Sequence, residues 1–106
     1  MNIYPAEVEA VLLTHPAVGD VGVIGVPNQE WGEEVKAVVE PQPGVEATPE
    51  LAAELLAYCR EKLASFKCPR SVDFTNELPR HDNGKLYKRA LRDAYRAAAA
   101  AAAGTG

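Results

Sequence analysis

The first fifteen positions of the chain carry apolar residues at helical spacing. Three of them share one face of a helix at positions i, i+3 and i+4: Val8, Val11 and Leu12. Pro5 suits the first position of a helix, and the residue before Pro16 is biased away from helical geometry. The pattern therefore predicts a helix over residues 3–15.

Two stretches rich in Val then predict strands. Residues 18–26 combine Val and Ile with three evenly spaced glycines, which allow a bulge or the close approach of another segment. Residues 34–40 alternate apolar and polar positions, as a strand with one buried face does. The polar turn 27–32 lies between them and holds the only tryptophan, Trp31. We expect an antiparallel hairpin with a wide loop.

The second half of the chain predicts a helix, a short strand and a last helix. Thr48 and Pro49 suit the cap and the first position of a helix, and an apolar stripe follows them. The stripe consists of Leu51, Leu55, Leu56, Cys59 and Leu63. Residues 72–75 alternate as a third strand, and residues 86–96 form the last predicted helix.

The predicted element order is α-β-β-α-β-α, which indicates an α+β fold. We expect a small three-stranded, mainly antiparallel sheet covered by about three helices. A chain of 106 residues suits a single core, so residues 1–96 are expected to form one domain. Residues 97–106, seven alanines followed by Gly-Thr-Gly, are expected to be a frayed or disordered tail.

Composition excludes several classes of function. The net charge of −4 argues against nucleic acid as a partner, because binding to its backbone requires neutralisation of phosphates. The sequence has no run of about 18 apolar residues, so we expect no membrane span. It also lacks a secretory signal, and a cytoplasmic location is expected. The two cysteines and two histidines lack the spacing of a metal site, so none is expected.

The segment from Leu78 to Arg92 has the most distinctive chemistry. A proline and a polar loop lead into Gly84 and Lys85, and a basic helix is predicted to begin directly afterwards. Glycine gives the loop conformational freedom, and the backbone N–H groups of a helix N-terminus favour an anion. This pattern indicates a lysine on a mobile tip that completes an active site carried elsewhere. A helix that simply starts with a basic turn is the alternative.

A phosphate-binding P-loop also ends in Gly-Lys. It requires a first glycine five residues before the second one, and Ser or Thr directly after the lysine to bind the metal. Pro79 and Leu86 occupy these two positions. The sequence therefore excludes a P-loop.

Four groups of residues, in order along the chain, carry a resemblance to a known family. They are 3–9; 25–27 with 31–33 and 35–37; 66–70; and 78–80 with 84–92. These motifs resemble the C-terminal domain of the adenylate-forming enzymes, which include acyl-CoA synthetases, the adenylation domains of peptide synthetases and the luciferases. The likeness covers about residues 2 to 96. It is nearest to the acyl-CoA ligases that use fatty or aromatic acids.

The resemblance implies a two-step reaction. A carboxylic acid attacks the α-phosphate of ATP to give acyl-adenylate and pyrophosphate, and coenzyme A then displaces AMP as a thioester. In this family a large N-terminal domain is the partner that holds ATP, magnesium and the acid. The C-terminal domain is mobile and closes over it in two orientations. The lysine that matches Lys85 enters the site for the first step, and Gly84 supports its loop.

The resemblance also implies a CoA-binding face formed by Trp31, Phe66, Lys67 and Arg70. The two aromatic rings would flank the nucleotide or the pantetheine, and the two cations would meet phosphates. Cys68 stands where some relatives carry a basic residue, so a different arrangement of the phosphate site is expected. For Trp31, packing against the predicted hairpin is the alternative.

The large partner domain is absent from this sequence, so the chain alone is expected to be inactive. One interpretation is a fragment or truncated product of an acid–CoA ligase. The other is a free-standing, non-catalytic interaction module derived from the same domain.

Overall fold

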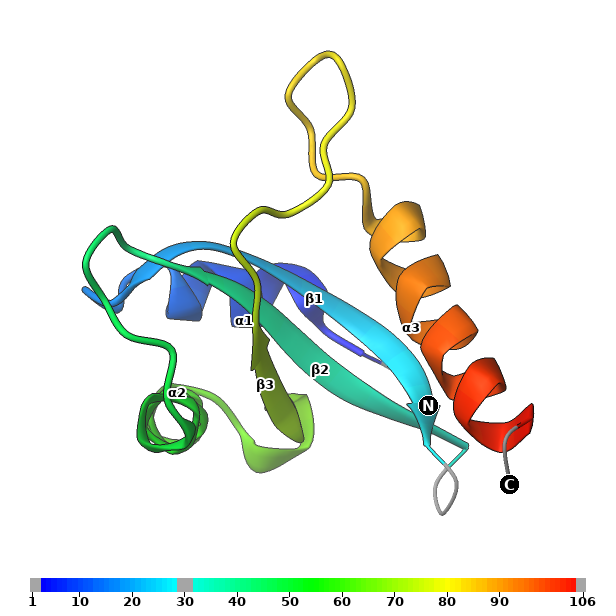
Figure 1. Ribbon diagram of the computed structural model, residues 1–106. Helices are drawn as coiled ribbons and strands as arrows, with labels where there is room; N and C mark the ends of the chain where they lie inside the picture. The colour runs from blue at the N-terminus through cyan, green and yellow to red at the C-terminus, as the bar shows by residue number, and fades with distance from the viewer. Residues whose placement is uncertain (1–2, 29–31, 105–106) are drawn as a thin grey trace.

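The computed structural model describes residues 3–28 and 32–104. Within them the chain forms three α-helices, one short 3-10 helix and three strands, in the predicted order α-β-β-α-β-α. Figure 1 shows a curved sheet flanked by the helices, with one long loop projecting from the body between β3 and α3. The predicted α+β architecture is therefore confirmed.

The first helix, α1, spans Pro5–Leu12 and is shorter than the predicted 3–15. After Leu12 the N–H groups of Thr14 and His15 donate to carbonyls three residues back, at 3.1 and 3.0 Å. The ring of His15 also accepts a hydrogen bond from the Ala17 N–H at 3.0 Å. These tighter contacts end the helix ahead of Pro16, as the geometry before a proline requires.

The sheet has the order β1-β2-β3 and is mixed. Strands β1 (Val18–Asn28) and β2 (Gly32–Pro41) are antiparallel, with Val21 opposite Val39 and Asn28 opposite Gly32. The register shifts between Val18 and Asp20, so the bulge allowed by the glycine between them is present. Strand β3 (Ser71–Phe74) pairs with β2 in parallel.

Strand β1 is buried on both faces, because alternate side chains enter two separate apolar clusters. Val21 and Val23 pack with Val8 and Leu12 of α1 and with the second helix. Ile24 and Val26 pack on the opposite face against Leu78, Leu86 and Leu91. This explains the nearly continuous apolar run that the sequence shows here. The sheet therefore lies between two layers of packing, and the projecting loop belongs to the second one.

Helix α2 (Pro49–Lys62) connects the parallel strands β2 and β3. The Thr48 hydroxyl accepts a hydrogen bond from the Leu51 N–H at 3.1 Å, which confirms the predicted cap. Leu55 and Cys59 are fully buried against α1 and the sheet. A short 3-10 helix, η1 (Ser65–Lys67), then turns the chain into β3.

Helix α3 spans Lys88–Gly104 and differs from the predicted 86–96 at both ends. It begins later because Leu86 is still engaged in an antiparallel bridge with Arg80. It continues through the run of alanines, which have the highest helix propensity. The division into a domain at 1–96 and a tail at 97–106 stays a prediction. No helix in the described ranges is both long and apolar enough to cross a membrane.

Candidate functional site

Residues 78–87 form a small hairpin, here called the Lys85 hairpin, which projects from the molecule (Figure 1). The Gly84 N–H donates to the His81 carbonyl at 2.8 Å, and the His81 N–H donates to the Lys85 carbonyl at 2.8 Å. Gly84 has a φ of +84°, a left-handed conformation that a Cβ atom disfavours. A glycine in this conformation closes a tight hairpin loop. Gly84 therefore sets the shape of the turn directly ahead of Lys85.

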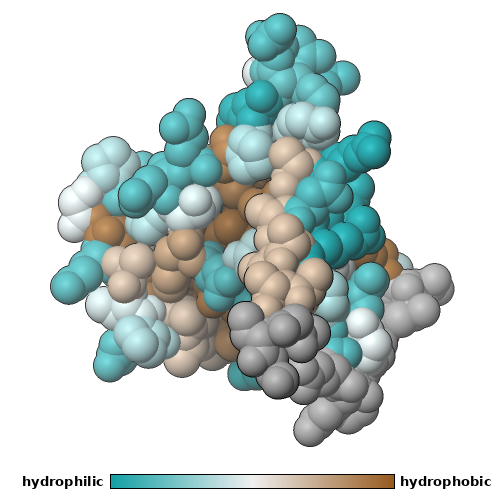
Figure 2. All heavy atoms as spheres, turned by 45° about the vertical axis from the view of Figure 1, so that its right-hand side comes forward, coloured by the Kyte–Doolittle hydropathy of each residue, from teal (hydrophilic) through white to brown (hydrophobic). Residues whose placement is uncertain are grey.

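The side chain of Lys85 is exposed at the end of this hairpin. Its own N–H donates to the Asn83 Oδ1 at 3.1 Å, which holds its backbone. Within residues 3–28 and 32–104, no ion pair involves the Lys85 ammonium. Figure 2 shows that the projecting end, at the top of the view, is hydrophilic on this face. The ammonium is thus free to meet an anion supplied from outside the described chain.

The predicted place of Lys85 next to the first turn of a helix is wrong. Helix α3 starts at Lys88, so Lys85 belongs to the hairpin. Two basic residues that follow Lys85 are engaged in α3: Lys88 pairs with Glu9 at 2.6 Å, and Arg89 lies 4.0 Å from Asp93. These contacts tie α3 to α1 and support α3 itself. Lys85 lies apart from these contacts, and, like Arg92, it takes part in no ion pair within the described residues.

The base of the Lys85 hairpin is fixed on the sheet. Leu78 is buried, and its N–H donates to the Glu40 carboxylate at 2.7 Å. A Cβ atom at Gly22 would lie 2.8 Å from the Leu86 Cδ2, so β1 leaves room for that leucine only because residue 22 has no side chain. The ring of His81 stacks on Tyr87 with centroids 4.1 Å apart. The hairpin therefore projects from residues that are packed and hydrogen-bonded against the sheet.

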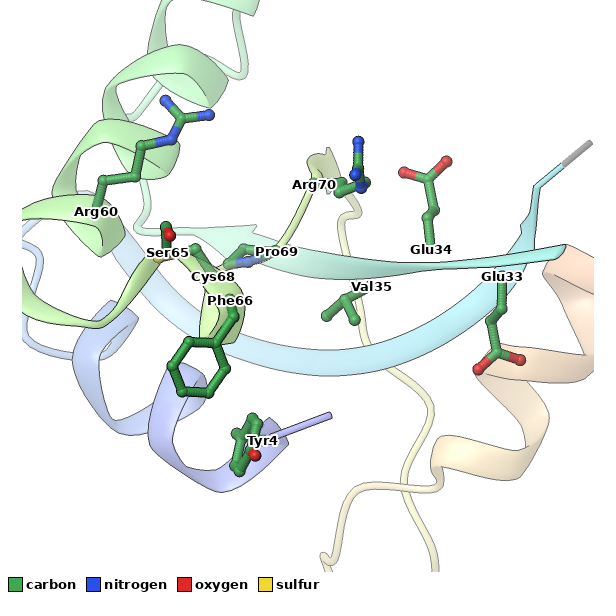
Figure 3. Close-up of a pocket in the computed structure, with 10 residues that line it drawn as sticks. All are labelled: Tyr4, Glu33, Glu34, Val35, Arg60, Ser65, Phe66, Cys68, Pro69 and Arg70. Atoms are coloured by element: carbon green, nitrogen blue, oxygen red, sulfur yellow. The ribbon is translucent and has the colours of Figure 1, made fainter. Parts of the chain in front are cut away.

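A hollow of about 630 Å³, the η1 hollow, lies beside the turn that follows α2 (Figure 3). Its lining comes from the start of α1, from β2, from the end of α2 and from the turn around η1. These residues are Tyr4, Glu33, Glu34, Val35, Arg60, Ser65, Phe66, Cys68, Pro69 and Arg70. It shares no residue with the Lys85 hairpin. Figure 1 shows the hairpin and the η1 turn at opposite ends of the molecule.

The predicted CoA-binding residues are placed in three different ways. Phe66 and Arg70 line the η1 hollow, and the Phe66 side chain is 70% exposed. Lys67 is not among the lining residues, but its ammonium lies 5.8 Å from the centre of the Phe66 ring and pairs with Glu7 at 3.1 Å. Trp31 lies outside the described residues. The structure therefore brings three of the four predicted residues to one turn, and two of them, Phe66 and Arg70, line the hollow.

Arg70 lies next to β2, close to the carboxylate of Glu34. Its N–H donates to the Val35 carbonyl at 2.8 Å, which holds the turn against β2. The hydroxyl of Ser71, at 2.7 Å from the Glu34 carboxylate, lowers the pKa of Glu34, and the Arg70 charge contributes in the same direction. Glu34 is therefore an anion at neutral pH, and it lines the same hollow as Arg70.

Cys68 contributes no charge to the hollow. Burial raises the pKa of its thiol, which donates weak hydrogen bonds to the carbonyls of Leu63 and Ala64 at 3.9 and 3.6 Å. Burial raises the pKa of the neighbouring core residue Cys59 to about 11. A raised pKa keeps both thiols mainly neutral at physiological pH, which disfavours the reactive thiolate form.

Sequence reasoning missed Arg60 and Tyr4 as lining residues. Figure 3 shows the guanidinium groups of Arg60 and Arg70 on one side of the hollow and the rings of Phe66 and Tyr4 on the other. The signal available was a basic residue in the last turn of α2, just ahead of the basic-aromatic turn. Guanidinium groups recognise phosphate, and rings stack on bases. The hollow thus combines two guanidinium groups and two rings with the carboxylates of Glu33 and Glu34.

Comparison with known proteins places the chain in a family. Residues 7–85 match the model of the family described as AMP-binding enzyme C-terminal domain. The chain belongs to this family. Among relatives of this AMP-binding C-terminal domain is the 2-succinylbenzoate–CoA ligase of Geobacillus kaustophilus. It is 50% identical over 91 residues, which cover 86% of this chain and 18% of that ligase.

Solved structures show the same fold in CoA ligases. The anthranilate CoA ligase AuaEII in complex with anthranoyl-AMP matches with a TM-score of 0.86 and 38% identity, over 92% of this chain and 19% of that one. The acyl-CoA synthetase of Brucella canis matches with a TM-score of 0.80 and 45% identity, over 86% of this chain and 17% of that one. This AMP-binding C-terminal domain therefore spans less than a fifth of the length of these relatives.

Proposed function

We propose that this chain is the C-terminal lid domain of an AMP-forming acid–CoA ligase, in which Lys85 acts in adenylate formation. The observation that carries the proposal is the exposed Lys85 ammonium, which no ion pair engages within residues 3–28 and 32–104, at the end of a hairpin with a firm base. The family match and the CoA-ligase relatives support the same role.

The chemistry assigned to Lys85 is electrostatic. When a carboxylate attacks the α-phosphate of ATP, negative charge spreads over both groups, and a nearby ammonium stabilises it. A cation about 4 Å from a partner charge contributes at most about 4 kcal/mol at an effective dielectric constant of 20. Magnesium and ATP would be held mainly by the large N-terminal domain. Lys85 would be delivered to that site and withdrawn after the first step.

We assign the second step to the face that carries the η1 hollow. Phe66 would stack on the adenine of CoA, and Arg70 would bind one of its phosphates. Lys67 would join them only by leaving Glu7, with which it pairs at 3.1 Å. Trp31 is assigned to the same face on the family resemblance alone. Because the hollow and the Lys85 hairpin share no residue, one domain could present them in turn.

The reaction that we propose for the whole ligase converts a carboxylic acid, ATP and CoA to acyl-CoA, AMP and pyrophosphate. We propose that the chain is inactive alone, because it spans less than a fifth of its ligase relatives and the large domain would hold ATP and the acid. Both cysteines are free, which fits the reducing conditions of the cytoplasm, the location that we propose. Acid-dependent exchange of pyrophosphate into ATP by the isolated chain would contradict the proposal that the chain is inactive alone.

The decisive test uses a chimeric ligase, in which this chain replaces the C-terminal domain of the Geobacillus kaustophilus relative. Pyrophosphate exchange with 2-succinylbenzoate measures the first step, and thioester formation from preformed acyl-adenylate and CoA measures the second. Lys85→Ala should slow the first step by about a hundred- to a thousand-fold, because a preorganised charge is lost. It should leave the second step close to the parent rate.

A matched control is Arg89→Gln, which removes an exposed cation whose ion pair within the described residues is with Asp93 on the same helix. It should alter neither step. Equal slowing of both steps by Lys85→Ala would contradict the proposed function, as would a chimera with the unchanged chain that makes no adenylate.

A further inference from the structure

Beyond its buried base, the Lys85 hairpin is linked to the sheet by the side chain of Arg80, which makes two contacts. One nitrogen of its guanidinium forms an ion pair with Asp20 on β1. The other terminal nitrogen donates to the Gly84 carbonyl at 2.8 Å. Asp20 is itself held, since its second carboxylate oxygen accepts the Val21 N–H at 2.9 Å. The guanidinium therefore connects a fixed point on the sheet with the turn of the hairpin.

The contact with Gly84 reaches the backbone of Lys85 directly. The Gly84 carbonyl and the Lys85 N–H belong to the same peptide group, which is planar. The Arg80 guanidinium donates to the carbonyl of this peptide group. The side-chain oxygen of Asn83 accepts a hydrogen bond from the N–H of the same group at 3.1 Å. The orientation of this plane sets the direction in which the Lys85 side chain leaves the hairpin. A rotation of the plane would move the distant ammonium by more than it moves the backbone.

Arginine is suited to this task because its planar fork donates in two directions at once. Lysine carries a single compact charge and cannot hold both partners in a fixed geometry. The side chains of Arg80 and Asp20 are 41% and 26% exposed, and ion pairs of this kind contribute little to folding stability. The contact is therefore better explained by orientation of the turn than by stability of the domain.

We infer that Arg80 is a positioning residue for Lys85: its guanidinium, anchored on Asp20, orients the Gly84–Lys85 peptide so that the ammonium reaches the reacting phosphate. This inference rests on the proposed role of Lys85 in adenylate formation. A misplacement of about 1 Å in such a group can cost on the order of a hundred-fold in rate. The effect of losing Arg80 should be confined to the first step.

The test measures both half-reactions in the chimeric ligase. Arg80→Gln should lower kcat for adenylate formation about ten- to a hundred-fold and leave the KM values for ATP and acid near those of the parent. Thioester formation from preformed adenylate should not change. Arg80→Lys should recover only part of the loss. Asp20→Asn, which spares the Gly84 contact, should give a smaller loss than Arg80→Gln.

A double-mutant cycle separates positioning from a general structural role. If Arg80 acts through Lys85, Arg80→Gln should cause no further slowing in the Lys85→Ala background. A loss of folding would instead slow both half-reactions in either background, and the milder Asp20→Asn variant then decides whether only the first step responds. Arg89→Gln again serves as the control with unchanged rates.

The outcomes distinguish this inference from the proposed function. If Lys85→Ala slows adenylate formation while both Arg80→Gln and Asp20→Asn leave it unchanged, the inference is overturned and the proposed function stands. If Arg80→Gln slows the reaction as much with Lys85→Ala as without it, the inference is also overturned. If Lys85→Ala has no effect on the first step, both the proposed function and the inference are overturned.

Discussion

The Lys85 hairpin and the η1 hollow present their cations in opposite ways. Beside the hollow, Lys67 pairs with Glu7, and the Glu34 carboxylate lines the hollow together with Arg70. In the hairpin, the ion pairing is at the base, through Arg80 and Asp20, and the terminal Lys85 has no such partner among the described residues. A cation with a nearby counter-ion is suited to ligands that are bound and released. A cation without one is suited to charge that exists only briefly during a reaction.

The aromatic side of the hollow gives the largest expected effect on the second step. Phe66→Ala should raise the KM for CoA about 5- to 100-fold, because one stacking contact with a base is lost. The ring is 70% exposed, so the melting temperature of the domain should change little. Steady-state kinetics with preformed adenylate measure the effect. Damage to adenylate formation by the same variant would break the proposed separation of the two regions.

The cations at the η1 turn should differ in their contributions. Arg70→Ala should raise the KM for CoA about tenfold, as expected for one charge-assisted hydrogen bond to phosphate. Lys67→Ala should raise it only about twofold, because Lys67 must first leave Glu7, with which it pairs at 3.1 Å. Parallel titrations of CoA with the two variants compare them directly. A larger effect at Lys67 would show that the pair with Glu7 opens readily when CoA binds.

Two glycines with the same backbone conformation allow the effect of turn shape on stability to be separated from its effect on the reaction. Gly84 and Gly44 have φ values of +84° and +85°, and a Cβ atom at either position would meet nothing within 4 Å. Gly84→Ala and Gly44→Ala should each destabilise the domain by about 1–2 kcal/mol, measured by urea unfolding. Only Gly84→Ala should also slow adenylate formation, by about fivefold, the rate equivalent of about 1 kcal/mol. Equal kinetic effects would mean that the turn shape at Lys85 does not matter.

The sequence predicted local features well because neighbouring residues determine them. Thr48 and Pro49 start α2 as expected, since a cap and a first-turn proline act within a few positions. No local sequence signal predicts the parallel pairing of β3 with β2, because the alternation of side chains does not indicate which strand lies next to which. The start of α3 was missed for the same reason. Leu86 is a good helix former, but its pairing with Arg80 and its packing over Gly22 keep it outside the helix.

The site was predictable in part. Gly84 and Lys85 stand out by their order in the chain, and the structure adds that Gly84 has a positive φ. The pairing of Lys67 with Glu7 joins residues sixty positions apart, which no local pattern can reveal. Arg60 was missed because a basic residue in the last turn of a helix has an ordinary explanation in the helix dipole. Only the fold places Arg60 and Arg70 around one hollow.

The mixed sheet also has a consequence for the order in which the domain assembles. Strands β1 and β2 are neighbours in sequence, so their hairpin closes a short loop and can form early. The contacts that fix the Lys85 hairpin and α3, from Arg80 to Asp20 and from Lys88 to Glu9, join segments from opposite ends of the chain. Such contacts form late and open first. Amide hydrogen exchange should therefore be slowest in the first two strands, and the segment that carries Lys85 should open as a separate unit while they stay folded.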